Sequence, residues 1–355
     1  MRLKMRGSLK VIPLIIMGIV IASCSSGPSA TGATTTSGPA PTGPLQTVNV
    51  AVPGFNYTQD AFYVADANGY FAAQGIKLHI DAVGSNLVTA VESGQDDLAY
   101  IGTGLALSIV HNGKPVSIIY NALGGGAGAV LAAHPGITSV SQCKSFATLA
   151  PGSAAYGWAV EYAKSVGQQT PNIIPVSTQA SIVAAVVGGE ADCGLNDYSS
   201  WAPALSQKQV VILSNTTIVK DRPKFIPPSF PEAAIFGLKT YLTSHTALTV
   251  KFLTAYQKAI TNVVQKGNAT QIAGLLQTSQ AAQGSYSSMP LATVATQVKN
   301  ALSWYSPNNG FIPKSDWPQA LTVFQAQGLT FVTGPTYSYG SVVDMSYYDK
   351  ATGHA

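Results

Sequence analysis

Hydrophobic and polar positions along this chain follow the alternation that is typical of strands and helices. The pattern predicts strands at 47–52, 76–83 and 98–101, and helices at 58–74 and 86–93. Strands that are separated by helical stretches form parallel β-α-β units. We therefore predict an α/β fold that begins near Thr47.

The same pattern contains an internal repeat. The segment VTAVESGQDDLA at 88–99 resembles VAAVVGGEADCG at 183–194, at a constant offset of 95 residues. The same offset of 95 residues also aligns the strand-like segments 116–119 and 211–214. This match is weaker, but it is consistent with the alignment of the two repeat copies. The sequence therefore predicts two similar α/β units, each too small to be the whole chain.

The chain becomes mainly helical after the second unit. Residues 247–266 carry apolar side chains at helical spacing, and we predict further helices at 291–304 and 316–327. We expect these helices to pack against the α/β units and to carry no chemistry.

The first residues have the three parts of a bacterial lipoprotein signal. Four basic residues precede a short apolar run, and Ile21-Ala22-Ser23-Cys24 resembles the lipobox. The alternative, a transmembrane anchor, needs roughly 20 apolar residues, and this run is shorter. We predict a signal peptide at 1–23 and a lipid, such as palmitate, on Cys24 that anchors the chain to the extracytoplasmic side of the cell membrane.

Residues 24–46 carry no charge and consist almost entirely of small and polar residues with proline. Such a segment cannot bury enough apolar surface to fold, so we predict a disordered tether.

Removal of the signal peptide changes the charge of the chain. Four of the 19 basic residues lie in the signal, which leaves fifteen basic against 15 acidic residues. The pI of 8.8 therefore belongs to the precursor, and the mature chain lacks the basic surface that nucleic-acid binding requires. Charged residues make up 10% of the chain and hydrophobic residues 46%, which indicates a large core.

Several ordered motifs connect the chain to a known family. They are AFYVA at 61–65, GYFAAQGI at 69–76, SGQ with DLA at 93–99, and GKPV at 113–116. Together they resemble the solute-binding proteins of nitrate, sulfonate and taurine ABC importers, a group that includes thiamine-precursor-binding relatives. The resemblance covers about residues 48–328 and implies an α/β, type II periplasmic-binding-protein fold. In that fold two lobes close on a ligand in the cleft between them, and C-terminal helices follow.

The resemblance also implies how the chain is divided between the lobes. We expect a first lobe at 47–125 and 236–355 and a second lobe at 126–235, with crossings near 123–128 and 231–237. The first crossing contains Gly124-Gly125-Gly126. This run lacks the Lys-Ser/Thr that follows a phosphate-binding loop, so it indicates a mobile connection.

The ends of the predicted strands locate the cleft, since ligands of open α/β sheets bind outside the carboxyl ends of strands. The candidate loops are 55–60, 102–104, 151–158 and 196–201. The candidate ligand-binding residues are Phe55, Asn56, Tyr57, Asp60, Gly102, Thr103, Gly152, Ser153, Trp158, Asn196, Asp197 and Trp201. Ser153 has two interpretations, a ligand contact and a simple helix cap, and one residue can serve both.

Six aromatic residues occupy these loops and favour an organic ligand that is aromatic or heterocyclic. They are Phe55, Tyr57, Tyr156, Trp158, Tyr198 and Trp201. The loops contain no Arg or Lys, which disfavours nitrate or a simple sulfonate.

We therefore predict the solute-binding subunit of an ABC importer, which captures a sulfonate-like, pyrimidine-like or other aromatic ligand by lobe closure. Its partners would be the permease and ATPase subunits, with the protein itself a monomer that needs no metal or cofactor. The alternatives are a ligand-sensing lipoprotein and an enzyme like the synthase of the thiamine pyrimidine. The five histidines are scattered, and the cysteine-rich iron-binding run of those enzymes has no counterpart here.

Two cysteines remain in the predicted body, Cys143 and Cys193. Both would lie outside the membrane, where disulfides persist, so we predict that they are bridged. Two buried thiols are the alternative, because Cys is also a common core residue.

Overall fold

The computed structural model describes residues 43–54, 57–127, 129–216, 218–227, 230–284, 286–287, 289–305 and 308–354. The predicted signal peptide, Cys24 and nearly all of the predicted tether lie outside these ranges, as do Phe55 and Asn56. Within them, no helix combines the length and the apolar character that crossing a membrane would take.

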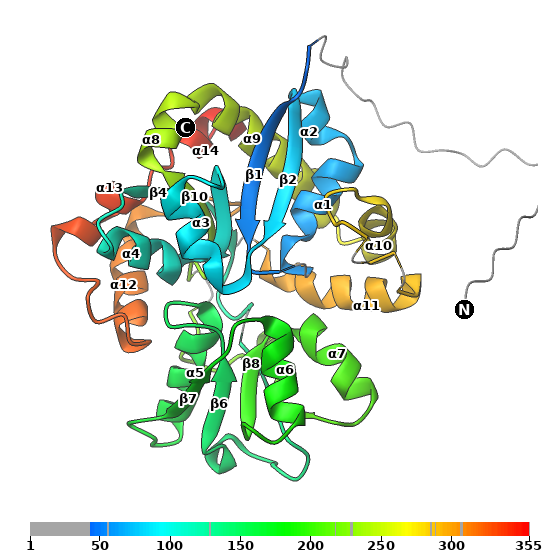
Figure 1. Cartoon of the computed structure of the whole chain (residues 1–355), viewed down its shortest axis with the longest axis vertical. Helices are drawn as coiled ribbons and strands as arrows, with labels where there is room; N and C mark the ends of the chain where they lie inside the picture. The colour runs from blue at the N-terminus through cyan, green and yellow to red at the C-terminus, as the bar shows by residue number, and fades with distance from the viewer. Residues whose placement is uncertain are drawn as a thin grey trace, which may run out of the picture. The chain divides into compact units, whose positions relative to one another are not determined.

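The strands of the described residues form two separate five-stranded sheets (Figure 1). In spatial order, the first sheet consists of β2 (Ile76–Ala82), β1 (Gln46–Val52), β3 (Leu98–Gly102), β10 (Ala233–Leu238) and β4 (Val116–Leu123). The second consists of β7 (Asn172–Pro175), β6 (Ser145–Thr148), β8 (Cys193–Asn196), β5 (Val130–Ala133) and β9 (Val211–Ser214).

The two sheets have the same topology. In each, the first three strands pair in parallel, and the fourth strand runs antiparallel to both of its neighbours. The strands β4 and β9, which the weaker part of the repeat aligns, occupy the same outer position. We refer to each sheet with its helices as a lobe.

The predicted repeat is confirmed by its local structure. Both copies are a helix, a glycine and a strand, with α3 (Leu87–Ser93) before β3 and α6 (Gln179–Val187) before β8. Gly94 and Gly189 follow these helices with φ of +74° and +75°, a conformation that glycine adopts without strain.

An aspartate in each copy fixes the strand that follows. The Asp97 carboxylate accepts the Asn49 N–H of β1 at 2.8 Å. Its counterpart Asp192 accepts the N–H groups of Lys144 and Ser145, at 2.8 and 3.1 Å, where β6 begins. The same side chain therefore joins equivalent neighbouring strands in both lobes.

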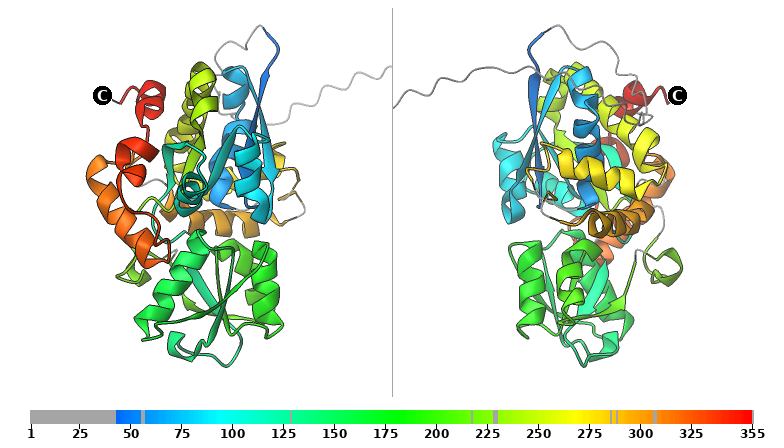
Figure 2. Two further views of the ribbon diagram at one scale, coloured as in Figure 1. Left: turned by 60° about the vertical axis from the view of Figure 1, so that its left-hand side comes forward. Right: turned by 90° about the vertical axis from the view of Figure 1, so that its right-hand side faces the viewer.

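Helices cover the faces of both sheets, and Figure 2 shows the second sheet between helices on either side. Besides α3 and α6, the helices of the α/β units include α4 (Thr103–His111), α5 (Ala154–Ser165) and α7 (Tyr198–Ser206). The C-terminal helices are α8 (Lys239–Ser244), α9 (Thr246–Ala259), α10 (Ala269–Thr278), α11 (Leu291–Ala301), α12 (Trp317–Ala326), α13 (Tyr339–Val342) and α14 (Ser346–Thr352). The helices predicted at 247–266, 291–304 and 316–327 correspond to α9 with a π-helical turn, to α11 with a 3₁₀ turn, and to α12.

The single helix predicted at 58–74 is wrong, because the segment is broken. It consists of a 3₁₀ turn (Tyr57–Gln59), α1 (Asp60–Ala67) and α2 (Tyr70–Ala73). Gly69 separates the two helices with φ of +67°. A left-handed residue cannot continue an α-helix, so the apolar stripe changes direction there. Phe62 of α1 still reaches the C-terminal helices, with its ring centroid 4.7 Å from that of Tyr256 in α9.

The chain passes from the first sheet to the second between Leu123 and Val130 and returns between Ser214 and Ala233. The expected second crossing at 231–237 was placed too late, because most of that segment already pairs with β3 and β4 as β10.

Cys143 and Cys193 form a disulfide, with their Cα atoms 5.7 Å apart. Both residues are fully buried. Cys143 precedes β6 and Cys193 begins β8, its neighbour in the sheet. The bridge therefore joins two central strands of the second lobe across a sequence separation of 50 residues.

Reduction of this disulfide should destabilise the second lobe. The chain-entropy argument for a loop of this length gives about 4 kcal/mol, and disulfides typically contribute about 2–4 kcal/mol to the free energy of unfolding. We expect the air-oxidised protein to weigh two hydrogen atoms less than the reduced protein, and reductant to lower its unfolding temperature. Two titratable thiols in the denatured, oxidised protein would contradict the bridge.

Candidate functional site

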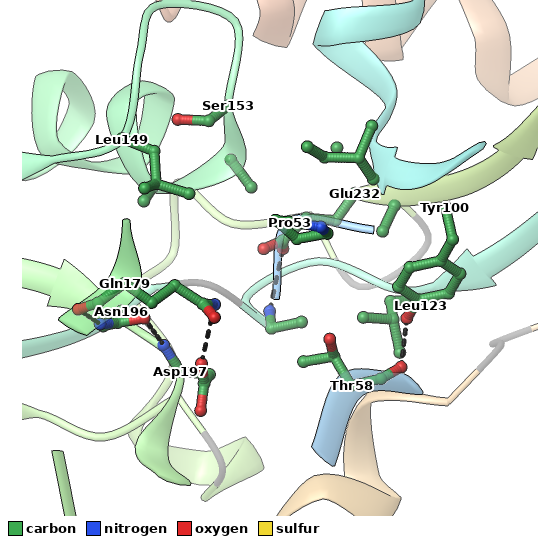
Figure 3. A pocket seen from close by; sticks show the side chains of 16 residues that line it. Pro53, Thr58, Tyr100, Leu123, Leu149, Ser153, Gln179, Asn196, Asp197 and Glu232 are labelled. Carbon is green, nitrogen blue, oxygen red and sulfur yellow. Dashed lines mark hydrogen bonds between the residues drawn. The ribbon is translucent and has the colours of Figure 1, made fainter. Parts of the chain in front are cut away.

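A cavity of about 80 Å³ lies between the two lobes (Figure 3). First-lobe and crossing residues that line it are Pro53, Thr58, Tyr100, Ile101, Gly102, Leu123, Ala127, Glu232 and Ala233. Second-lobe residues are Leu149, Ser153, Ala154, Ala155, Gln179, Asn196 and Asp197. The carboxyl ends of β3, β4 and β8 are among these segments, so the cavity lies where ligands of α/β sheets bind.

A hydrogen-bonded group of polar side chains forms the second-lobe wall. Asp197 caps α7, since its carboxylate accepts from the Ser200 N–H at 3.0 Å and from the Ser200 hydroxyl at 2.8 Å. Gln179 donates to the same carboxylate at 3.0 Å, and its backbone carbonyl accepts from Asn196 at 2.9 Å. These contacts hold the three side chains in one orientation toward the cavity, as Figure 3 shows.

Ser153 is confirmed as a helix cap, and its predicted ligand contact stays a prediction. Its hydroxyl accepts the Tyr156 N–H at 3.2 Å, which caps α5, and the residue also lines the cavity. Ala154 and Ala155 of the first turn line the cavity as well. The N-terminus of a twelve-residue helix, with its partial positive charge, therefore faces the site.

The first-lobe wall is built around Thr58 and Tyr100. The Tyr100 hydroxyl donates to the Thr58 carbonyl, which ties the 3₁₀ turn to β3 (Figure 3). Gly102 ends β3 and lines the cavity. Thr103 follows it, is fully buried, and donates its N–H to the Glu232 carbonyl at 2.9 Å.

Glu232 was missed by the sequence analysis. It precedes β10 in the second crossing and is 2% exposed. Its carboxylate accepts the N–H groups of Gly126 and Ala127 in the first crossing, the latter at 3.0 Å. Glu232 therefore binds the two crossings to each other and also lines the cavity. No local motif marks it, because its partners are more than 100 residues away.

Asp60, a predicted site residue, is fully buried at the first position of α1. Neither carboxylate oxygen has a hydrogen-bond partner among the described residues. Burial raises the pKa of Asp60 well above its ordinary value, and the charge of Asp197 raises this pKa further. The two lobes therefore bring carboxyl groups close enough to influence each other, although Asp60 does not itself line the cavity.

The structure places the two tryptophans, both predicted to contact the ligand, away from the cavity. Trp158 and Trp201 are fully buried and do not line the cavity. Trp158 packs edge-on against Phe230, with ring centroids 5.4 Å apart, and Trp201 donates to the Val130 carbonyl at 3.1 Å. They lie on α5 and α7 instead of in loops, and the helical period turns them toward the second sheet.

The other candidates divide as follows. Gly152 adopts φ of +89° in the turn before α5 and does not line the cavity; a Cβ atom there would lie 3.0 Å from side-chain atoms of Leu105 and Ser108 in the first lobe. Tyr156 and Tyr198 are partly buried and also lie outside the lining. Tyr57 begins the 3₁₀ turn, and Phe55 and Asn56 lie outside the described residues.

A second cavity of about 190 Å³ adjoins the first and is mainly apolar. It shares Pro53, Ile101, Leu149 and Ser153 with the first cavity. Leu87, Val88, Leu105 and Val176 extend it along the boundary of the lobes. Apolar surface makes up most of the lining of both cavities, so the site consists of a chamber, where the polar side chains described above converge, and an adjoining arm.

The chemistry of the lining is that of binding by neutral and acidic groups. Hydroxyls, amides and two carboxylates are among the groups that line the chamber, and no Lys, Arg or His of the described ranges lines it. Among the described residues, no group of three His, Cys, Asp or Glu side chains is placed to hold a metal ion.

Residues 56–269 match the model of the family described as NMT1/THI5 like. No curated protein matches the sequence. Among solved structures, a protein from Bordetella bronchiseptica RB50 is similar with a TM-score of 0.67 and 20% identity, over 86% of this chain and 97% of its own.

Two further solved structures are similar to this chain. The alkanesulfonate-binding protein SsuA from Xanthomonas axonopodis pv. citri, bound to MOPS, has a TM-score of 0.64 and 12% identity, over 85% of this chain and all of its own. The periplasmic nitrate-binding protein NrtA from Synechocystis PCC 6803 has a TM-score of 0.65 and 13% identity, over 87% of this chain and 89% of its own. At such identities the likeness establishes the fold alone, and it confirms the predicted periplasmic-binding-protein fold.

The unpartnered Asp60 should destabilise the fold above acidic pH. Its pKa is higher in the fold than its ordinary value of 3.8, so the folded state holds the proton more tightly than the unfolded chain. The wild-type free energy of unfolding should therefore fall as the pH rises from about 4 toward the raised folded value. Asp60→Asn should remove this decline. At neutral pH the free energy of unfolding of the variant should exceed that of the wild type by about 1–3 kcal/mol.

Urea denaturation of both proteins between pH 4 and 8 measures this difference. The exposed Asp221 provides the control, since Asp221→Asn should leave the pH profile unchanged. A difference between Asp60→Asn and wild type that does not grow with pH would contradict an unpartnered carboxyl at this position.

Proposed function

We propose that this chain, which belongs to the NMT1/THI5-like family, is the extracytoplasmic solute-binding subunit of an ABC importer. It captures a small organic ligand in the cavity between its lobes, and the lobes close over that ligand. The observation that carries this proposal is a cavity whose walls come from both lobes and from both crossings. The relatives named for alkanesulfonate and nitrate binding share this fold, which supports the same class of function here.

Glycines at the boundary allow the lobes to approach closely. A Cβ atom on Gly104 of the first lobe would lie 2.6 Å from the Gly152 carbonyl oxygen of the second. A Cβ atom on Gly102 would lie 3.1 Å from the Ala154 nitrogen. Backbone therefore meets backbone at the mouth of the site, an arrangement that suits a closing cleft.

C-terminal helices of the first lobe contact the second lobe at two places. Helix α11 packs against α7, and α12 packs against α5. Lys164 of α5 also donates to the Ala326 carbonyl at the end of α12. These helices can guide the second lobe as it moves on the hinge that the two crossings form.

Binding without chemical change fits the lining better than catalysis. The hydroxyl of Ser153 caps a helix, and among the residues that the structure describes no histidine, cysteine or lysine lines the cavity to activate a nucleophile. A sensing role would use the same binding step and differ only in the membrane partner. Import through a permease and an ATPase is the function that the family-level likeness supports.

Lobe closure depends on the glycine contact at the boundary. Gly104→Ala adds a methyl group that would lie 2.6 Å from the Gly152 carbonyl oxygen, closer than two such atoms can approach. The two lobes of the variant therefore cannot come as close together as they do here. We expect ligand affinity to fall about tenfold to a hundredfold, since overpacking a contact costs about 1–3 kcal/mol. Small-angle scattering should show ligand-induced compaction in the wild type and less of it in the variant.

Gly274→Ala is the matched control, because Gly274 lies in α10 with open space around its Cβ position. It should leave affinity unchanged and stabilise the helix slightly. Unchanged affinity and compaction in Gly104→Ala would count against closure at this boundary.

The proposed location rests on the lipobox-like segment before Cys24. The tether at 24–46 would then hold a monomeric body near the permease. Cys24→Ala should abolish labelling by a palmitate analogue and release the protein from the membrane or leave the precursor unprocessed. Undiminished labelling of this variant would disprove the anchor.

A further inference from the structure

Among the described residues, the charged groups that line the chamber are all acidic. Asp197 enters from the second lobe and Glu232 from the crossing, each 2% exposed, and no described basic side chain lines the chamber. Arg222 lies outside the lining and donates to the Thr216 carbonyl at 2.9 Å. Burial lowers its pKa, and the charge of Glu232 partly offsets that effect. Arg222 therefore influences Glu232 from outside the lining, whose two charged side chains are both acids.

Helix N-termini at the site would by themselves favour an anion, so their occupancy matters. The N-terminus of α7 is already capped by the Asp197 carboxylate, and the Thr103 N–H at the start of α4 is bonded to the Glu232 carbonyl. Only the α5 terminus, at Ala154 and Ala155, faces the chamber without a carboxylate cap. This terminus can accept one electron-rich group of a ligand.

Asp60 adds a third carboxyl group beside the chamber. It follows the lining residue Thr58 by two positions, is fully buried, and has no hydrogen-bond partner among the described residues. The burial of an unpartnered carboxyl costs free energy, and folded proteins keep such groups mainly where function uses them. A positive charge in the chamber would lower this cost.

From these contacts we propose that the solute carries a cationic nitrogen with N–H donors, which binds between Asp197 and Glu232. Its apolar part lies in the adjoining arm formed by Leu87, Leu105 and Val176. The inference rests on the proposed function, because it assigns a ligand class to the same cleft. It separates this chain from its relatives named for sulfonate and nitrate binding, whose ligands are anions.

The test compares size-matched probes of different charge with the full chain purified in detergent. Benzylamine and benzamidine are the cations, benzyl alcohol and benzamide the neutral probes, and benzoate and benzenesulfonate the anions. The unfolding temperature is measured as each probe is titrated, since a ligand of the native state raises it. We expect the cations to half-saturate at concentrations at least about tenfold lower than the other probes.

The Asp197→Asn variant identifies the residue responsible. Asparagine caps helices as well as aspartate does, so α7 should remain folded and the unliganded unfolding temperature should stay close to that of the wild type. We expect benzamidine affinity to fall at least about tenfold and its advantage over benzamide to shrink. Glu190→Gln, which neutralises an exposed acid of the same lobe, should change neither value.

The outcomes separate the two proposals. Stronger binding of the anionic or neutral probes, or cation binding that Asp197→Asn leaves intact, would overturn the cationic ligand and leave the solute-binding function standing. If no probe shifts the unfolding temperature, the cleft does not bind small solutes of this size, and the proposed function fails together with the inference.

Discussion

The carboxylate of Glu232 is the interaction on which the arrangement of the two lobes depends. A buried carboxylate must be compensated by donors, and here the donors are N–H groups of Gly126 and Ala127 in the opposite crossing. The Thr216 hydroxyl adds a bond to the Gly126 carbonyl at 2.6 Å. The hinge is therefore two connections joined at one point, and that point also forms part of the wall of the cavity.

This constraint explains the glycine run that precedes the second lobe. A Cβ atom on Gly125 would lie 2.4 Å from the Pro227 carbonyl oxygen, and Gly126 adopts φ of +102°. Both positions require glycine because the two crossings pack backbone against backbone. The same reasoning applies to Gly104 and Gly152 at the mouth of the cleft, so glycine controls the spacing of the lobes at the hinge and at the rim.

The duplicated topology places the site, whereas individual side chains decide what it binds. Two sheets of the same strand order present their carboxyl ends to one cavity, and a shared fold can serve different ligands. In this chain the charged side chains that line the cavity are Asp197 and Glu232. Ligand choice therefore depends on a few residues such as Asp197 and Glu232, and the shared fold does not reveal it.

The sequence by itself determined the α/β alternation, the repeat, the C-terminal helices and the pairing of Cys143 with Cys193. These features depend on local periodicity or on a small set of possible partners, which a linear pattern records. Ser153 could also be predicted at the site, because a capping residue before a helix is a local signal. The break at Gly69 was missed, since an apolar stripe continues through a left-handed turn without a change in composition.

Only the tertiary structure decided which polar groups meet in the cavity. Trp158 and Trp201 were expected there, but the register of α5 and α7 turns them into the core. Glu232 and Gly126 are 106 positions apart, and Asp60 comes near Asp197 only because two lobes are folded against each other. Contacts over such separations are set by the packing of whole sheets, and no local pattern in the chain encodes them.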